Sequence, residues 1–195
     1  MVEDFSALAA RVLSGPARCG PVRLVAVDGP GGAGKSTFAG RLASALGGAP
    51  LVHTDDFASA EDPLGWWDRF EAQVLAPLGN GRPGRFQRHD WERGELAEWH
   101  DVPVVPCVVV EGVSSARRVV AGRLTLAIWI ETGRDERLRR GLDRDGPEAL
   151  GFWRSWMAAE DRHYAADRTA ERAGLVVDGL PALPHDPGRS YVRLR

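Results

Sequence analysis

A short stretch near the start of the chain, VDGPGGAGKSTF at residues 27–38, constrains the fold more than any other part of the sequence. Residues 29–36 match the pattern G-x-x-x-x-G-K-[ST] of a phosphate-binding loop. A valine-rich apolar run at 22–27 precedes the loop and an alanine-rich run follows it. These flanks predict a buried strand that leads into the loop and a helix that leaves it, a context that a chance glycine-rich turn would lack.

The residue types of this loop suit a bound polyphosphate. Glycines let consecutive backbone N–H groups point at phosphate oxygens, and the following helix directs its positive end at the same anion. Of the 25 basic residues, Lys35 alone is a lysine, and a compact ammonium can bridge phosphate oxygens where a planar guanidinium is too wide. We expect the cofactor to be held by Gly29, Gly31, Gly32, Ala33, Gly34, Lys35, Ser36 and Thr37, with the Ser36 hydroxyl on magnesium.

The rest of the chain alternates apolar runs with helical patterns. The apolar runs predict further strands at 50–54, 105–113, 124–131 and 175–179. Helical spacing predicts helices at 4–14, 63–76, 133–146 and 147–173, whereas 79–102 resists assignment and 181–195 is expected to be a loop with a short extended end. Strands of this kind, alternating with helices, predict a single domain over 1–195: a three-layer α/β fold with a parallel sheet of about five strands.

Composition excludes several classes of function. The net charge of −2 and pI near 6.2 argue against a nucleic-acid partner. There is no run of 18 apolar residues and no signal-peptide pattern, so we expect no membrane partner and a cytoplasmic location. The two cysteines fit a reduced compartment, and five scattered histidines give no zinc-ligand spacing.

Other nucleotide-binding machines are disfavoured as well. Lys35 is the only lysine, so the guanine-reading motif N-K-x-D of GTP switch proteins is absent. The apolar run CVVV ends in Glu111, where a large ATPase motor would normally carry an aspartate. These features favour a small phosphotransferase.

Two adjacent aspartates follow the strand predicted at 50–54. Ligands of a parallel sheet sit at the carboxyl ends of its strands, so Asp55 and Asp56 are placed to meet a bound molecule. A phosphotransferase that acts on an alcohol needs a carboxylate to orient the hydroxyl and take its proton. An extended backbone points only one of two neighbours inward. We assign the base to Asp55 and a capping role to Asp56, although the sequence leaves the choice between them open, as it does a purely structural role for either.

The order of these motifs resembles a known family. The loop at 29–36, TDDF at 54–57, RHDW at 88–91, VVVEG at 108–112 and RLRRGLDRD at 137–145 occur in the order seen in uridine kinases and their relatives, such as nicotinamide riboside kinase, pantothenate kinase and phosphoribulokinase. The resemblance spans roughly 22–178. It implies a P-loop kinase fold with a short helical lid at about 133–146, a substrate-binding insertion at about 57–102, ATP and Mg²⁺ as cofactors, and a small-molecule acceptor. The family often forms homo-oligomers.

The resemblance also implies roles for individual residues. Asp55 matches the catalytic aspartate, and Glu111 matches a glutamate near the magnesium. The acceptor would contact Asp55, Phe57, Asp62, His89, Asp90 and Trp91, with Asp68 as a second choice beside Asp62. The sequence departs from uridine kinases here: Ala58 follows Phe57, EDPLGWWD only echoes the ribose-binding segment, and His89 replaces a tyrosine. A nucleoside such as uridine or cytidine is the preferred acceptor, and a sugar, vitamin precursor or antibiotic stays open.

Arginines and tryptophans complete the candidate site. Arg137, Arg140 and Arg144 have the spacing of one helix face, and by the resemblance they clamp the phosphates, Arg137 and Arg140 as catalytic groups and Arg144 on the cofactor. The alternative is a solvated face paired with neighbouring acids. Four of the seven tryptophans fall within 66–99, where we expect most to form a small core, Trp91 excepted. His53 is expected to be structural. A nucleotide-binding regulatory protein with little turnover is the remaining alternative.

Overall fold

The computed structural model describes residues 1–59 and 64–195 of the chain. Its centre is a five-stranded sheet in the order β3-β6-β2-β7-β8, in which every neighbouring pair is parallel. This confirms the α/β class and the five-stranded parallel sheet expected from the apolar runs. The strands are β2 (Arg23–Asp28), β3 (Leu51–His53), β6 (Cys107–Glu111), β7 (Leu124–Glu131) and β8 (Leu175–Asp178).

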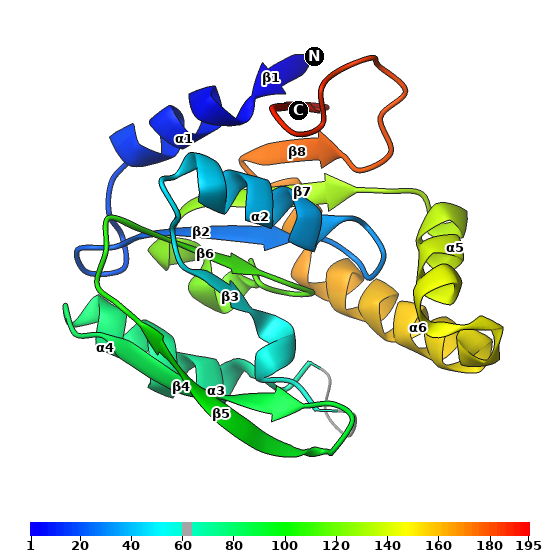
Figure 1. Cartoon of the computed structure of the whole chain (residues 1–195), viewed down its shortest axis with the longest axis horizontal. Helices are drawn as coiled ribbons and strands as arrows, with labels where there is room; N and C mark the ends of the chain where they lie inside the picture. The colour runs from blue at the N-terminus through cyan, green and yellow to red at the C-terminus, as the bar shows by residue number, and fades with distance from the viewer. Residues whose placement is uncertain (60–63) are drawn as a thin grey trace.

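Helices cover both faces of this sheet (Figure 1). Alternate residues of β2 point to opposite sides: Val25 and Val27 pack with α1 (Phe5–Ser14) and α2 (Lys35–Ala45), and Leu24 and Ala26 pack against the other layer. That other layer is a continuous helical run of α3 (Trp67–Phe70), η2 (Glu71–Leu75) and α4 (Ala76–Gly79), joined by η3 (Arg118–Arg123). The two buried clusters make the three-layer arrangement that nearly all-apolar strands require.

The helical run differs from the single helix expected over 63–76. It continues to Gly79, and its middle segment, η2, is a π-helical turn. Phe70, Val74, Leu75 and Leu78 remain buried through this turn. The extra residue of a π-turn therefore keeps the apolar side chains on the sheet even though the simple helical period is broken.

The segment at 79–102 forms an antiparallel hairpin of β4 (Gly84–Asp90) and β5 (Glu95–Val102). Most residues of β5 are exposed, so the strand lacks the alternation of apolar and polar residues by which strands are recognised. A second antiparallel pair joins β1 (Val2–Asp4) to β9 (Ser190–Val192), which confirms the short extended end of the chain.

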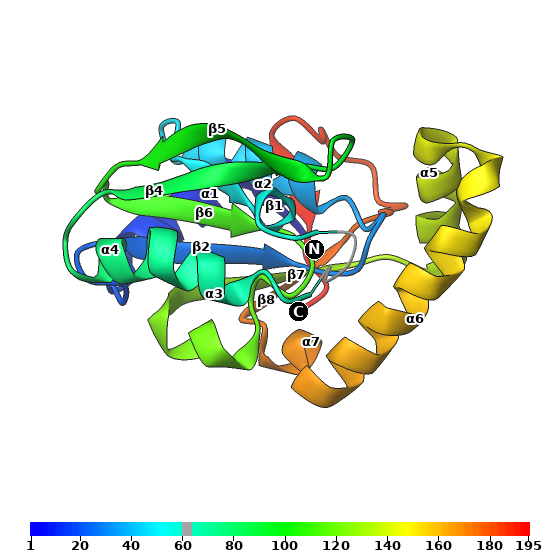
Figure 2. The same ribbon diagram turned by 90° about the horizontal axis from the view of Figure 1, so that it is seen from below.

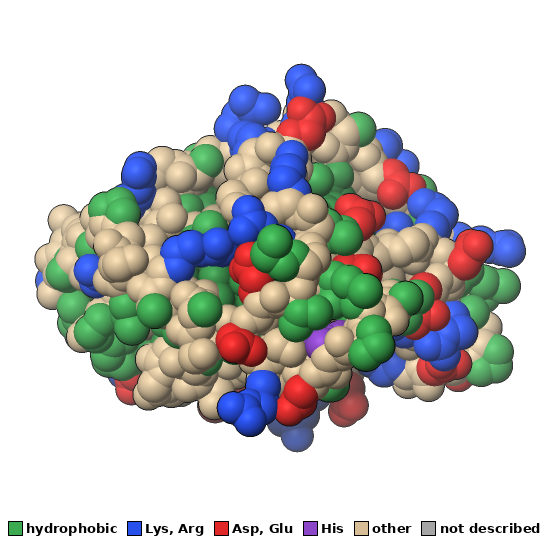
Figure 3. Space-filling model, turned by 90° about the horizontal axis from the view of Figure 1, so that it is seen from above, with side chains coloured by type: hydrophobic (Ala, Val, Ile, Leu, Met, Phe, Trp, Pro, Cys, Tyr) green, Lys and Arg blue, Asp and Glu red, His purple; other side chains and the backbone are tan. Residues whose placement is uncertain are grey.

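Two helices form an arm beside the carboxyl ends of the central strands (Figures 1 and 2). They are α5 (Arg134–Asp145) and α6 (Leu150–Asp167), joined by η4 (Pro147–Ala149). The helix expected over 147–173 is interrupted at Arg168, whose backbone is left-handed with φ of 58°, before α7 (Thr169–Arg172). On the face seen in Figure 3, basic and acidic side chains are interspersed. No helix in the described ranges is long and apolar enough to cross a membrane.

Candidate active site

Three loops meet at one edge of the sheet because β2, β3 and β6 are parallel and end in register. Val27 and His53 both pair with Glu111, the last residue of β6. The loop at 29–34 leaves β2, the short helix η1 (Thr54–Asp56) leaves β3, and the segment at 112–116 leaves β6. The motifs singled out in the sequence therefore come together as the rule for parallel sheets predicts.

The glycine loop is shaped by what packs against it. At Gly32, with φ of +76°, an added Cβ would lie 2.5 Å from the Arg137 carbonyl oxygen of α5. At Gly29, with φ of +146°, it would lie 2.7 Å from the carbonyl oxygen of Ile130. No side chain fits at either place, so the loop can take this path only with glycine. Lys35 opens α2, and its Nζ donates a hydrogen bond to the Pro30 carbonyl at 3.0 Å.

A cleft of about 660 Å³ lies between this loop and the α5–α6 arm. It brings together most of the residues that the sequence assigned to phosphate binding and to the base, and it adds aromatic residues from α6. The lining comprises Gly31, Gly32, Gly34, Lys35, Ser36, Thr37, Asp55, Trp91, Glu111, Gly112, Val113, Arg140, Gly141, Arg144, Asp145, Phe152, Trp153 and Trp156.

Asp55 faces the cleft, and Asp56 is not among the residues that line it. Burial of Asp55 raises the pKa of its carboxyl. The positive charge of Lys35 opposes this rise, and the negative charge of Glu111 reinforces it. A carboxylate that shares a cleft with the phosphate loop can accept a proton there. Of the two adjacent aspartates, Asp55 is the one that lines the cleft, and its role as the base stays a prediction.

Ser36 and Glu111 form the candidate magnesium site. The Ser36 hydroxyl donates to Glu111 Oε1 at 3.0 Å, and Nδ1 of His53 lies 2.5 Å from the same oxygen. Burial alone would raise the pKa of Glu111, but the hydrogen bond with His53 and the charge of Lys35 together lower it. A hydroxyl beside an ionised carboxylate is a donor set that suits Mg²⁺, which takes oxygen ligands and keeps several of them from phosphate and water.

The structural role expected for His53 stays a prediction, and the structure adds that its ring contacts the Glu111 carboxylate. The same hydrogen bond raises the pKa of His53 above its ordinary value. The sequence pattern could not indicate this contact, because it depends on the register of β3 against β6. Among the described residues, no group of three or more His, Cys, Asp or Glu side chains is gathered as a metal site on its own.

The three arginines of α5 have different surroundings. Arg140 lies over the phosphate loop and donates to the carbonyls of Gly32 and Gly179 at 3.2 and 2.9 Å. Arg144 lines the cleft while pairing with Asp145 at 2.7 Å. Arg137 is only 5% exposed and donates to the Thr132 carbonyl, away from the cleft lining. The catalytic role of Arg137 therefore stays a prediction, because its guanidinium does not face the cleft where phosphates would bind.

The residues assigned to the acceptor are only partly brought together. Phe57 is buried in the core, with its ring centroid 4.6 Å from that of Phe86. Asp62 lies outside the described residues. His89 packs edge-on against Trp91, and Asp90 accepts hydrogen bonds from the turn of the hairpin. Trp91 alone of these three lines the cleft.

Trp91 also connects the hairpin to the candidate base. Its indole Nε1 donates to the carbonyl oxygen of Asp55 at 2.9 Å. The tip of the β4–β5 hairpin is thereby attached to the loop that carries Asp55, and the Trp91 ring closes one side of the cleft.

Several residues in and around the site were not predicted from the sequence. Phe152, Trp153 and Trp156 of α6 line the cleft, and the Phe152 and Trp156 rings stack at a centroid distance of 5.9 Å. Asp28 is fully buried and accepts hydrogen bonds from the backbone N–H groups of Gly29 and Ser114 at 2.7 and 2.9 Å. An aspartate directly before the first loop glycine is a signal that could have indicated this anchoring role.

A second cavity of about 410 Å³ adjoins the cleft on the far side of the loop. The two share Gly34, Thr37 and Arg140. Its other walls come mainly from α2, from the ends of β7 and β8, and from the segment that runs from Gly179 through His185 to β9. A ligand that spans both spaces would pass over the start of α2.

The similarity of this chain to known proteins lies in its fold. No protein-family model matches the chain, and no curated protein matches it. Among solved structures, it is similar to a possible uridine kinase from Bacillus stearothermophilus, with 17% identity over 88% of this chain and 96% of the other and a TM-score of 0.64. A candidate fructose transport system kinase from Silicibacter sp. TM1040 gives 21% identity over 87% and 94%, with a TM-score of 0.52. The YGR205w protein gives 14% identity over 80% and 86%, with a TM-score of 0.51. The chain therefore has the P-loop kinase fold that the sequence motifs predicted.

Proposed function

We propose that this protein is a small-molecule kinase that transfers the γ-phosphoryl group of ATP to a hydroxyl of its acceptor. The observation that carries the proposal is the position of Asp55, in the same cleft as Lys35 and the glycine loop. Phosphoryl transfer needs phosphate-binding groups, a base and cationic side chains around one enclosed space, and this cleft holds all three.

In the mechanism, the loop amides and Lys35 bind the phosphates, and Ser36 and Glu111 would hold the magnesium. When bound, Mg²⁺ neutralises charge on the β- and γ-phosphates. Asp55 orients the acceptor hydroxyl and takes its proton while the hydroxyl oxygen attacks the γ-phosphorus. The bond between that phosphorus and the β–γ bridging oxygen breaks, and ADP leaves. Arg140 and Arg144 add positive charge beside the transferring group, and the arm excludes water that would otherwise hydrolyse ATP.

The adjoining cavity is suited to the base of the nucleotide. It begins at Gly34 and Thr37, where α2 starts, and therefore continues from the phosphate site away from Asp55. The acceptor would then occupy the part of the cleft near Trp91 and the aromatic residues of α6. We propose a nucleoside such as uridine or cytidine as that acceptor, since flat aromatic walls suit a planar base.

The test is ADP release by purified protein with MgATP across a panel of nucleosides, sugars and vitamin precursors. Stimulation by uridine or cytidine that Asp55→Asn removes would support both the reaction and the acceptor. Stimulation by a different alcohol would keep the reaction and replace the acceptor. Tight ATP binding with no stimulating acceptor would favour the alternative of a nucleotide-binding regulatory protein.

Activity is expected to depend on pH through Asp55. A base works only when ionised, so kcat/KM should fall as the pH drops through its pKa. Because burial raises that pKa, the fall should occur above the value of about 3.9 that is ordinary for aspartate. The measurement is kcat/KM for the acceptor against pH, with the Kd of ATP followed over the same range to separate nucleotide protonation. A profile that stays level down to that ordinary value would contradict the assignment.

Substituting Trp91 by phenylalanine should weaken the acceptor step. The change keeps an aromatic ring but removes the indole N–H that holds the Asp55 carbonyl. A neutral hydrogen bond contributes about 1 kcal/mol, so kcat/KM for the acceptor should fall roughly 2- to 10-fold while the Kd of ADP is unchanged. Trp99→Phe is the matched control, because Trp99 is half exposed on β5 and does not line the cleft. Equal effects of the two substitutions would refute this role for Trp91.

A further inference from the structure

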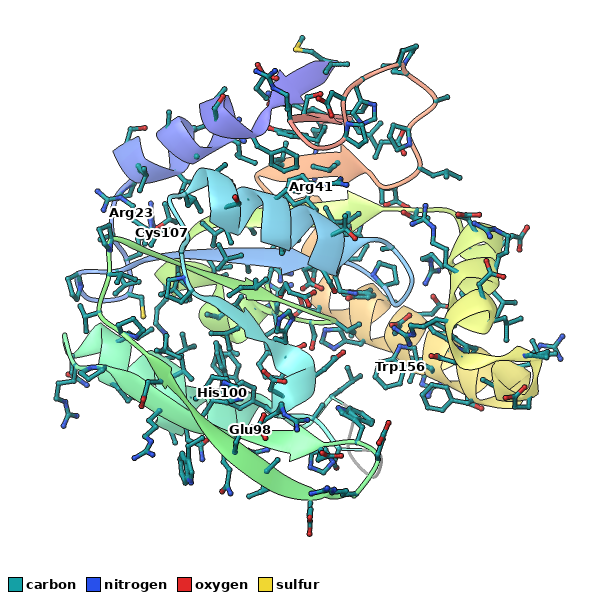
Figure 4. The ribbon with its side chains drawn as sticks, viewed as in Figure 1. Arg23, Arg41, Glu98, His100, Cys107 and Trp156 are labelled. Atoms are coloured by element: carbon teal, nitrogen blue, oxygen red, sulfur yellow. The ribbon has the colours of Figure 1, made fainter. Side chains whose placement is uncertain are left out.

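Helix α6 places a buried glutamate against the phosphate loop. Glu160 is 1% exposed, and its Oε1 accepts hydrogen bonds from the backbone N–H of Gly31 at 2.7 Å and from Nε1 of Trp156 at 2.5 Å. Its Oε2 lies 3.4 Å from a guanidinium nitrogen of Arg137. One carboxylate therefore joins the loop to both helices of the arm. Trp156, which donates to this carboxylate, is labelled on α6 in Figure 4.

Stability alone does not explain a glutamate in this place. Removing a carboxylate from water is costly, and buried ion pairs often contribute no more than well-packed apolar residues of the same volume. A methionine could fill the space, but its thioether sulfur is only a weak acceptor for the Gly31 hydrogen bond. Only a strong acceptor such as a carboxylate oxygen fixes the position of the Gly31 N–H.

Gly31 packs closely against the side chains of α6, so the position of α6 restricts where this part of the loop can lie. An added Cβ would lie 3.0 Å from Glu160 Oε1 and 3.1 Å from ring atoms of Trp153 and Trp156. A second side chain of α6 reaches the other end of the same loop segment: the Tyr164 hydroxyl donates at 2.8 Å to Asp28, which accepts the Gly29 N–H. Both ends of the 29–31 segment are thus held from α6, outside the cleft.

We propose that Glu160 is a positioning residue of the phosphate site. It holds the 29–31 segment in the conformation that binds phosphates, so the affinity for nucleotide depends on α6. This inference rests on the proposed function in one respect, that the loop binds a nucleotide. It assigns Glu160 no contact with substrate.

The experiment compares Glu160→Met, which keeps the volume but replaces the oxygen acceptor by a weakly accepting sulfur, with Glu160→Gln, which keeps an acceptor oxygen without the charge. Calorimetry with MgADP measures affinity, and hydrogen–deuterium exchange of a peptide covering 27–38 measures the hold on the nucleotide-free loop. We expect Glu160→Met to weaken MgADP binding roughly 10- to 100-fold and to speed exchange in the loop. Glu160→Gln should recover most of both.

Asp161→Ala is the matched control. Asp161 is the next residue of α6, is about half exposed and pairs with the exposed Arg134, a contact of little energetic weight. The Asp161→Ala substitution should leave the MgADP affinity and the hydrogen–deuterium exchange of the loop unchanged. An equal loss in this control would show that the general charge of α6 matters and would overturn the specific role of Glu160.

The remaining outcomes are also decisive. Unchanged MgADP affinity in Glu160→Met would overturn this inference and leave the proposed function intact. Absence of MgADP binding to the wild type would overturn both. Should Glu160→Met fail to fold, the wild type decides: slow exchange at Gly31 in the nucleotide-free protein supports the hold by Glu160, and rapid exchange overturns it.

Discussion

Replacement of Lys35 by arginine is expected to reduce turnover by roughly 10²- to 10³-fold or more, even though the positive charge is kept. Lys35 is 9% exposed, and its Nζ sits within hydrogen-bond distance of the Pro30 carbonyl inside the loop. A guanidinium is wider, and its donors point in fixed directions, so it cannot take the place of an ammonium in a loop this narrow. The measurement is kcat with MgATP and the acceptor identified from the panel, together with the Kd of ADP.

The control for this substitution is Arg11→Lys, the reverse exchange at an exposed position on α1. It should leave both constants unchanged, and thermal unfolding should show that each variant folds. If Lys35→Arg kept its turnover within a few-fold of the wild type, the loop would need only a positive charge at this position. The space in the loop would then not explain why the chain has a lysine there.

Substituting Asp55 by asparagine should lower kcat by roughly 10²- to 10⁴-fold, the usual contribution of a positioned base. The amide is nearly isosteric and can still accept a hydrogen bond, but it cannot take a proton. The affinity for ADP should stay the same or increase slightly, because the change removes a negative charge from a cleft that also holds Glu111. Rapid-quench measurement of the chemical step separates this effect from product release.

Asp56→Asn is the matched control for Asp55→Asn. Asp56 does not line the cleft. Burial raises the pKa of its carboxyl, and the charges of His53, His100 and Arg88 only partly oppose this rise. Its substitution should cost much less than that of its neighbour. A larger loss at Asp56 would reverse the assignment of the base.

The sequence predicted those parts of the site that follow from local pattern and from the rule of parallel strands. Lys35 lies in a contiguous motif, and Asp55 and Glu111 each come at or just after the end of an apolar run. The rule that ligands of a parallel sheet sit at the carboxyl ends of its strands places both carboxylates at one edge, and the structure adds that β3 and β6 are neighbours.

Other parts depended on contacts that no local pattern carries. Glu160 meets Gly31 across 129 residues of chain, and it occurs in a helix whose sequence gives no sign of a binding role. Helical spacing placed Arg137 and Arg140 on one face of α5, but it could not indicate that Arg140 reaches over the loop while Arg137 turns to Thr132 and Glu160. The sequence could not indicate the β4–β5 hairpin, because β5 is mostly solvent-exposed, β4 ends in a run of polar residues, and neither strand shows an apolar alternation.

The position of Lys35 has a consequence for protein chemistry. It carries the only ε-amino group of the chain, and that group is held inside the cleft. Reagents that acylate amines or form imines with them can therefore react at this side chain and at the α-amino group, and at no other lysine. A nucleotide-like aldehyde followed by reduction would label the cleft alone among the side chains, and bound phosphates would shield it. Covalent occupancy of Lys35, read by mass spectrometry of the peptide that contains it and so separated from labelling of the α-amino group, would then report directly on whether the cleft is filled.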